Sequence, residues 1–158
     1  MPGDLAERLI AASELHGDFV LSSGRRSNVY FDKFRFLTDP DLLRDTARAV
    51  ASLLPEGISH LAAPEGAATL LVAALALETG LPIAVVRREP KAYGTMSQLE
   101  GHAPAGAEVA LVEDVSTTAF TQYPASRRCS APPRSIAKMM MPIWHPSASS
   151  VLAARRTW

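Results

Sequence analysis

The order of apolar segments between residues 59 and 112 constrains the fold of this chain more than any other feature. Their spacing predicts a strand at residues 59–63, a helix at 67–79, and strands at 83–86 and 109–112. The helix is apolar nearly all round and is expected to be buried. A polar stretch with three glycines, residues 90–106, is expected to form a long loop. This alternation predicts an α/β fold with a parallel sheet flanked by helices.

The first 54 residues add helices and a hairpin to this pattern. Apolar residues at helical spacing predict a helix over residues 4–15, with Asp4 as its N-cap. Residues 18–21 and 28–32 are expected to be short strands around a Ser-Ser-Gly turn. Asp39 and Pro40 predict the start of a helix that runs to about Leu54.

The composition is that of a water-soluble globular protein. Of its 158 residues, 47% are hydrophobic and 20% are charged. No apolar run approaches the roughly 18 residues that cross a bilayer, and the N-terminus lacks a signal-peptide pattern. Cys129 is the only cysteine, which excludes an internal disulfide. We therefore expect a cytoplasmic protein without a membrane partner.

The strongest chemical signal follows the strand at residues 109–112. The strand ends in Glu113 and Asp114, and the hydroxyl residues Ser116, Thr117 and Thr118 come next. Ligands of open α/β sheets bind beyond the carboxyl ends of strands, where two carboxylates suit the two hydroxyls of a ribose. Hydroxyls and amides at a helix start suit a phosphate. The alternative is an acidic strand end followed by an ordinary N-cap.

Two further strand ends carry candidate anion-binding residues. Arg87, Arg88 and Lys91 follow the strand at residues 83–86, where cations can neutralise a diphosphate leaving group and a loop can exclude water. Residues 62–68 form a turn of small residues around Glu65, through which amides can approach a phosphate. A solvated basic turn and an ordinary α/β turn are the alternatives.

An aromatic pair, Tyr30 and Phe31, lies near the basic residues Arg25 and Arg26. Such a pair could hold a flat anionic ring, or it could belong to the core. Together and in this order, these four stretches resemble the orotate phosphoribosyltransferases from about residue 17 to residue 118. The resemblance implies the type I phosphoribosyltransferase architecture, with residues 18–32 as an N-terminal hood over the orotate ring.

The resemblance also implies a reaction of pyrimidine biosynthesis. Orotate attacks C1 of 5-phosphoribosyl diphosphate, giving orotidine 5′-phosphate and diphosphate, with Mg²⁺ bound to the diphosphate rather than to a protein metal site. Lys91 and Asp114 would be catalytic. The implied substrate-binding residues are Tyr30, Phe31, Glu65, Gly66, Ala67, Arg87, Arg88, Tyr93, Glu113, Asp114, Ser116, Thr117 and Thr118. The resemblance further implies a homodimer, because the family's loop reaches the neighbouring subunit's site, and no nucleic-acid partner.

The composition changes abruptly at residue 119. Residues 119–158 contain five prolines and six basic residues but no glycine and no acid. Ala119 and Phe120 stand where the family's phosphate loop continues with glycine, and a Phe there is a steric problem. We therefore predict a truncated phosphoribosyltransferase-like domain at residues 1–118 and an atypical basic tail at 119–158.

For the tail we favour a product of translation that has left the family's reading frame. The alternatives are a basic disordered arm and an unusual folded extension. The C-terminal part of the sheet is then expected to be incomplete, with the edge of the strand at residues 109–112 uncovered, and this chain nearly inactive. The alternative functions are a non-catalytic regulator that binds phosphoribosyl diphosphate, and a defective gene product without function.

Overall fold

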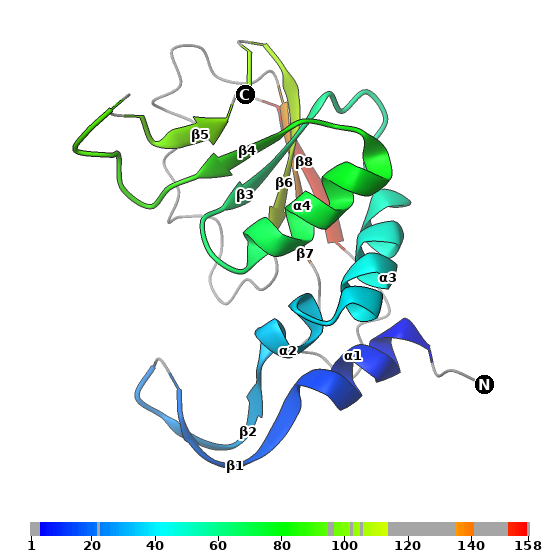
Figure 1. Ribbon diagram of the computed structural model, residues 1–158, viewed down its shortest axis with the longest axis vertical. Helices are drawn as coiled ribbons and strands as arrows, with labels where there is room; N and C mark the ends of the chain where they lie inside the picture. Colours follow the sequence, from blue (N-terminus) through cyan, green and yellow to red (C-terminus); the bar gives the residue numbers. More distant parts are fainter. Residues whose placement is uncertain are drawn as a thin grey trace.

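The computed structural model describes residues 4–21, 23–94, 97–101, 103–104, 106–113, 135–140 and 152–157. A six-stranded sheet, ordered β5-β4-β3-β6-β7-β8, forms its centre (Figure 1). The strands are β3 (His60–Pro64), β4 (Ile83–Val86), β5 (Leu99–Gly101), β6 (Glu108–Glu113), β7 (Ser135–Met140) and β8 (Leu152–Thr157). The four central strands run parallel, and β5 and β8 are antiparallel edge strands. The predicted α/β fold with a parallel sheet is confirmed.

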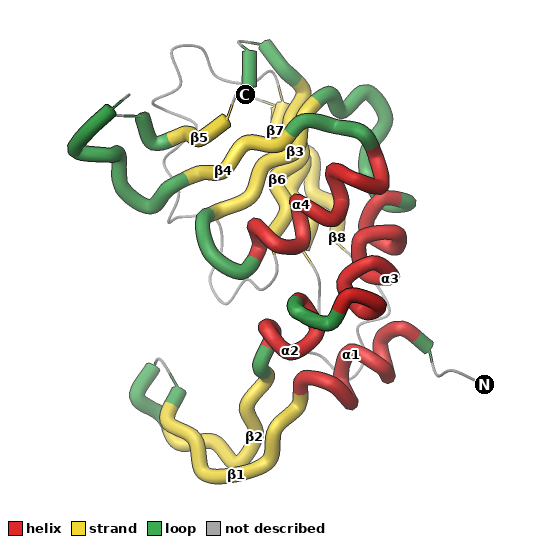
Figure 2. The backbone as a smooth tube through the Cα atoms, viewed as in Figure 1, coloured by secondary structure: helices red, strands yellow, loops and turns green. Residues whose placement is uncertain are grey.

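The helix α4 (Ala68–Thr79) packs across one face of the sheet (Figure 2). Its Leu71, Val72 and Leu75 are fully buried, together with Leu61 of β3. The helix ends at Gly80, whose left-handed conformation and backbone N–H to the Ala76 carbonyl terminate it. Among the described residues, no helix is long and apolar enough to span a membrane.

The helix α3 (Pro40–Ala51) packs against α4. The Asp39 carboxylate accepts hydrogen bonds from the backbone N–H groups of Asp41 and Leu42, so the predicted helix start is confirmed. The helix ends at Ala51, three residues before the predicted end, because residues 52–54 form a turn. Ala47 and Val50 bury their side chains in the main core.

The N-terminal region is a helix, α1 (Leu5–Ser13), followed by a hairpin of β1 (Glu14–Val20) and β2 (Arg26–Phe31). The helix ends two residues before its predicted end, because Glu14 and Leu15 belong to β1, and both strands are longer than predicted. Figure 1 shows the hairpin extending away from the sheet. A short helix, α2 (Lys33–Leu37), follows; the sequence reading missed it, although Asp32 caps it and its Phe36 and Leu37 are buried.

Two expectations of missing structure are wrong. The predicted loop at residues 90–106 contains β5, which pairs with β4. The edge of β6 is not left uncovered, because β7 pairs with it from Glu108↔Ser135 to Glu113↔Met140. Pro133 and Pro142 lie outside the bounds of β7, so the strand itself contains no proline. The division at residue 118 and the change of reading frame stay predictions.

Candidate functional site

The carboxyl ends of β3, β4 and β6 meet at one edge of the sheet. Pro64 of β3 pairs with Val86 of β4. β3 and β6 also pair in parallel, from His60↔Val109 to Ala62↔Leu111, so both strands end at the same edge. β4 and β6 lie on opposite sides of β3, which makes this edge a topological switch point, where open α/β sheets bind ligands. Three of the four predicted segments therefore gather here.

The turn between β3 and α4 consists largely of small residues. Gly66 adopts a φ of 116°, a conformation that residues with a Cβ rarely adopt. Ala67 is the N-cap of α4 and provides no side-chain cap, while its methyl group is buried in the core. The Thr69 and Leu70 N–H groups donate to the Gly66 and Ala67 carbonyls, so an anion at this helix start would be held by the N–H groups that precede them.

Glu65 joins this turn to the start of the loop that follows β4. Its Oε1 accepts a hydrogen bond of 2.9 Å from the backbone N–H of Arg88. Its Oε2 lies 3.9 Å from Nη1 of Arg87. The Glu65 N–H in turn donates to the Val86 carbonyl at 2.8 Å. Glu65 was predicted as part of an anion-binding turn, and in the structure its carboxylate fixes the base of the cationic loop.

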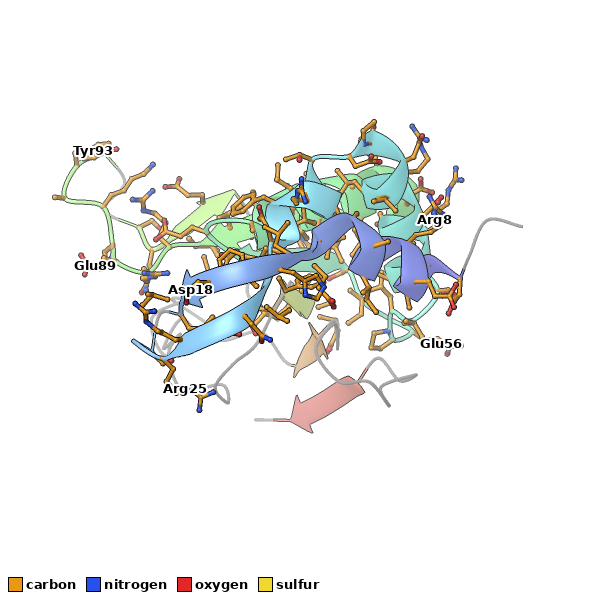
Figure 3. All side chains as sticks on the ribbon, turned by 90° about the horizontal axis from the view of Figure 1, so that it is seen from below. Arg8, Asp18, Arg25, Glu56, Glu89 and Tyr93 are labelled. Carbon is orange, nitrogen blue, oxygen red and sulfur yellow. The ribbon has the colours of Figure 1, made fainter. Side chains whose placement is uncertain are left out.

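Lys91, the predicted catalytic residue, makes an ion pair within its own hairpin. Its Nζ lies 2.6 Å from Oε1 of Glu100 and 5.7 Å from the centre of the Tyr93 ring. Nη1 of Arg87 lies 3.8 Å from the same Glu100 oxygen. Figure 3 shows Tyr93 and Glu89 projecting outward at the loop. The structure thus brings Arg87, Lys91 and Tyr93 together and leaves Arg88 exposed.

Sequence reasoning missed Glu100. The residue lies in the segment that was expected to be a loop, where no register with β4 could be assigned. A signal was present: an acid followed by a glycine comes soon after a run of cations, as expected of opposite charges that face each other across a hairpin. Gly101 is required there, since a Cβ would lie 2.7 Å from the Ile83 carbonyl oxygen.

Tyr30 and Phe31 occupy opposite faces of β2, as neighbouring strand residues do. The Tyr30 side chain is 43% exposed, and its ring centre lies 5.4 Å from that of Phe19. Phe31 packs against the core and contacts Phe36, with ring centres 6.4 Å apart. Only Tyr30 of the pair is available to a ligand on the outer face. Figures 1 and 3 show this hairpin and the loop after β4 as separate projections on the same side.

Glu113 is the last residue of β6 and is half-buried at the switch point. The other predicted residues of that motif, Asp114, Ser116, Thr117 and Thr118, lie outside the described residues. Their roles stay predictions.

Solved structures share this architecture. A crystal structure of Mycobacterium tuberculosis orotate phosphoribosyltransferase in complex with Fe(III) dicitrate has a TM-score of 0.70 and 28% identity, covering 85% of this chain and 80% of that chain. Another, of the same enzyme in complex with 5-phospho-α-D-ribosyl 1-diphosphate, has a TM-score of 0.64 and 25% identity, covering 85% and 78%. The fold is that of the type I phosphoribosyltransferases.

Curated relatives define the family within that class. Orotate phosphoribosyltransferase of Nocardioides sp. is 39% identical over 123 residues, which cover 78% of this chain and 69% of the relative. That of Thermococcus gammatolerans is 45% identical over 107 residues, covering 66% and 57%. No family model matches the chain. The chain belongs to the orotate phosphoribosyltransferase family, and it spans between 57% and 62% of the length of three archaeal relatives that it matches.

Proposed function

We propose that this chain binds 5-phosphoribosyl diphosphate at the carboxyl edge of its sheet and transfers the phosphoribosyl group to orotate. The products are orotidine 5′-phosphate and diphosphate. One observation carries the proposal: in a chain of this family, the cations Arg87 and Lys91 meet at Glu100, and Arg87 also lies 3.9 Å from Glu65 in the turn that leads into α4 at the switch point. Both features are suited to an anionic ligand with several phosphate groups.

The transfer reaction requires stabilisation of the departing diphosphate anion. As the bond between C1 and the diphosphate breaks, negative charge grows on the leaving oxygen and positive charge on the ribose. Lys91 and Arg87 would neutralise the diphosphate, and amides at the start of α4 would hold a phosphate oxygen. Glu113, with Asp114, would accept hydrogen bonds from the ribose hydroxyls. Contacts that strengthen as charge develops lower the barrier.

Magnesium fits this arrangement as an ion carried by the substrate. Within the described ranges, no group of three or more His, Cys, Asp or Glu side chains could hold a metal ion. Mg²⁺ commonly keeps several waters and binds through substrate phosphates with one or two carboxylates. Glu113 places a carboxylate at this edge of the sheet, where it would take that role. When bound, the ion would neutralise part of the charge on the diphosphate.

We propose Tyr30 as the hood residue that contacts the orotate ring, because its ring is the exposed member of the aromatic pair. Phe31 would contribute indirectly, by packing β2 against the core. We also propose a homodimer in the cytoplasm. The homodimer is what the family resemblance implies, because the loop of a family member reaches the neighbouring subunit's site.

The test is a transfer assay on the whole chain with phosphoribosyl diphosphate, Mg²⁺ and either orotate, uracil or adenine. We expect orotidine 5′-phosphate with orotate only. Because Ala119 and Phe120 replace the family's glycine-containing loop, we expect slow turnover, so calorimetric binding of phosphoribosyl diphosphate is measured beside it. Binding without transfer would favour a non-catalytic binder, and an absence of both would overturn the proposed function.

A further inference from the structure

The two cations of the proposed site share one carboxylate. Oε1 of Glu100 lies 2.6 Å from Nζ of Lys91 and 3.8 Å from Nη1 of Arg87. These side chains are only partly exposed; the solvent-exposed fraction of the Lys91 side chain is 22%. A carboxylate that interacts with two cations in this way occupies the position expected of an external anion.

The backbone holds Glu100 in this position. Glu100 pairs with Val85 across the antiparallel β4–β5 ladder. The ladder continues into the base of the loop, where the Arg87 N–H donates to the Gln98 carbonyl at 2.8 Å, and Nε2 of Gln98 donates to the Arg87 carbonyl at 2.9 Å. Gly101 permits the close approach of the two strands. The carboxylate therefore comes from a paired strand, while Lys91 comes from the loop.

We propose that Glu100 is a positioning residue that holds Lys91 and Arg87 in the ligand-free protein, and that a diphosphate group has to displace it. The identity of the displacing anion rests on the proposed function. A diphosphate carries more charge than one carboxylate and can contact both cations at once. Each binding event then includes the loss of the Glu100 ion pairs, so Glu100 lowers the affinity for the diphosphate. It acts through Lys91 and needs no contact with the substrate.

The expected effect is modest, because partly exposed ion pairs contribute little. We expect Glu100→Gln to tighten the binding of phosphoribosyl diphosphate and of inorganic diphosphate by about two- to five-fold. Turnover should change by less than about two-fold, because the contact between Lys91 and the leaving group is the same in both proteins once Glu100 is displaced. A residue with a merely structural role would not be expected to raise the affinity and leave turnover unchanged when it is replaced.

Glu89→Gln is the matched control. Glu89 belongs to the same loop, is exposed and forms no ion pair with another described residue. The two variants change the net charge of the β4–β5 hairpin equally. A gain in affinity caused by net charge alone would be the same in both, whereas release of Lys91 would be confined to Glu100→Gln.

A ligand-free measurement tests the ion pair without reference to the reaction. The chain has three lysines, Lys33, Lys91 and Lys138. Brief labelling with an amine-acetylating reagent, read by mass spectrometry, gives the modification of Lys91 relative to Lys33. We expect this ratio to rise several-fold in Glu100→Gln and to stay unchanged in Glu89→Gln, because the Glu100 carboxylate, 2.6 Å from Nζ, holds the partly buried amine away from the reagent.

The outcomes separate the inference from the proposed function. A higher labelling ratio together with tighter diphosphate binding in Glu100→Gln alone supports the inference. An unchanged ratio, or an affinity for the diphosphate compounds that is unchanged or weaker in Glu100→Gln, overturns it. If the wild-type chain binds neither diphosphate compound, the proposed function fails; an unchanged ratio then rejects Glu100 as the partner of Lys91, and a raised ratio retains it.

Discussion

The turn between β3 and α4 and the loop between β4 and β5 lie at the same edge of the sheet but are held in different ways. The turn continues from a buried strand into a buried helix, and Ala67 and Ala68 pack into the core. The loop is held by hydrogen bonds at its base and by ion pairs of Glu65 and Glu100. Substitutions at the turn should therefore affect stability and binding together, whereas those in the loop should affect function alone.

This difference agrees with the roles that we propose for the two segments. A phosphate can be bound by backbone amides that never move, so that part of the site can be built into the core. A leaving group needs positive charge that strengthens its contact during the reaction, which requires long side chains at the surface. Long cationic side chains at a protein surface attract carboxylates, as Lys91 and Arg87 do here.

The largest expected effect is in the core beneath the turn. Leu71→Ala removes a fully buried side chain from α4 and should lower the free energy of unfolding by about 3–5 kcal/mol. Leu77→Ala, on the same helix but 89% exposed, should change it by less than about 0.5 kcal/mol. Denaturant titrations measure both. Equal losses would mean that α4 does not pack as described.

The reverse pattern is expected in the loop. Lys91→Ala should lower turnover about 100-fold, roughly 2.7 kcal/mol of transition-state stabilisation, and leave the affinity for phosphoribosyl diphosphate far less changed. Its free energy of unfolding should stay within about 0.5 kcal/mol of the wild type, because the lost ion pair lies near the surface. Steady-state kinetics decide, and an unchanged turnover would remove Lys91 from the mechanism.

The third prediction separates binding from stability at a single backbone position. Gly66→Ala introduces a Cβ at a φ of 116° and should cost about 1–2 kcal/mol of stability. Gly57, in a turn away from the site, has a φ of 81° and serves as the control. We expect both alanine variants to unfold at lower denaturant concentration and only Gly66→Ala to bind phosphoribosyl diphosphate more weakly. Weakened binding in both would trace the effect to general destabilisation.

The fold was predictable where periodicity and end signals agree. The apolar run of α4 with Gly80 at its end, and Asp39 before Pro40, each combine a pattern with a stop or start signal. β5 was missed because it is three residues long and its pairing depends on β4, which no local pattern reveals. α2 was missed because five residues are too few to establish a helical period. β7 was missed because its six residues do not alternate between apolar and polar side chains.

The site was predictable as residue types but not as contacts. The cations Arg87 and Lys91 follow a strand and could be found by reading along the chain. Their partner Glu100 lies on another strand, so finding it requires the hairpin register. Tyr30 and Phe31 were read as one aromatic pair, yet strand geometry turns them to opposite faces. Predicting the contacts of this site therefore requires the strand register and the direction of each side chain as well as its charge.

The smallest expected effect concerns Glu65, where the turn and the loop meet. Its carboxylate accepts the Arg88 N–H at 2.9 Å and lies 3.9 Å from Arg87, so it could act as a hydrogen-bond acceptor or as a charge. Glu65→Gln keeps an acceptor oxygen and removes the charge, while Glu65→Ala removes both.

The hydrogen bond should matter more, because it is short and fixes the backbone of the loop, whereas an ion pair at 3.9 Å near the surface contributes little. We expect Glu65→Gln to keep the affinity for phosphoribosyl diphosphate within about two-fold and Glu65→Ala to weaken it by about 1 kcal/mol. Calorimetric titration of both variants measures this difference. Equal losses would assign the effect to the charge of Glu65, and an effect in neither would mean that the loop base is held without it.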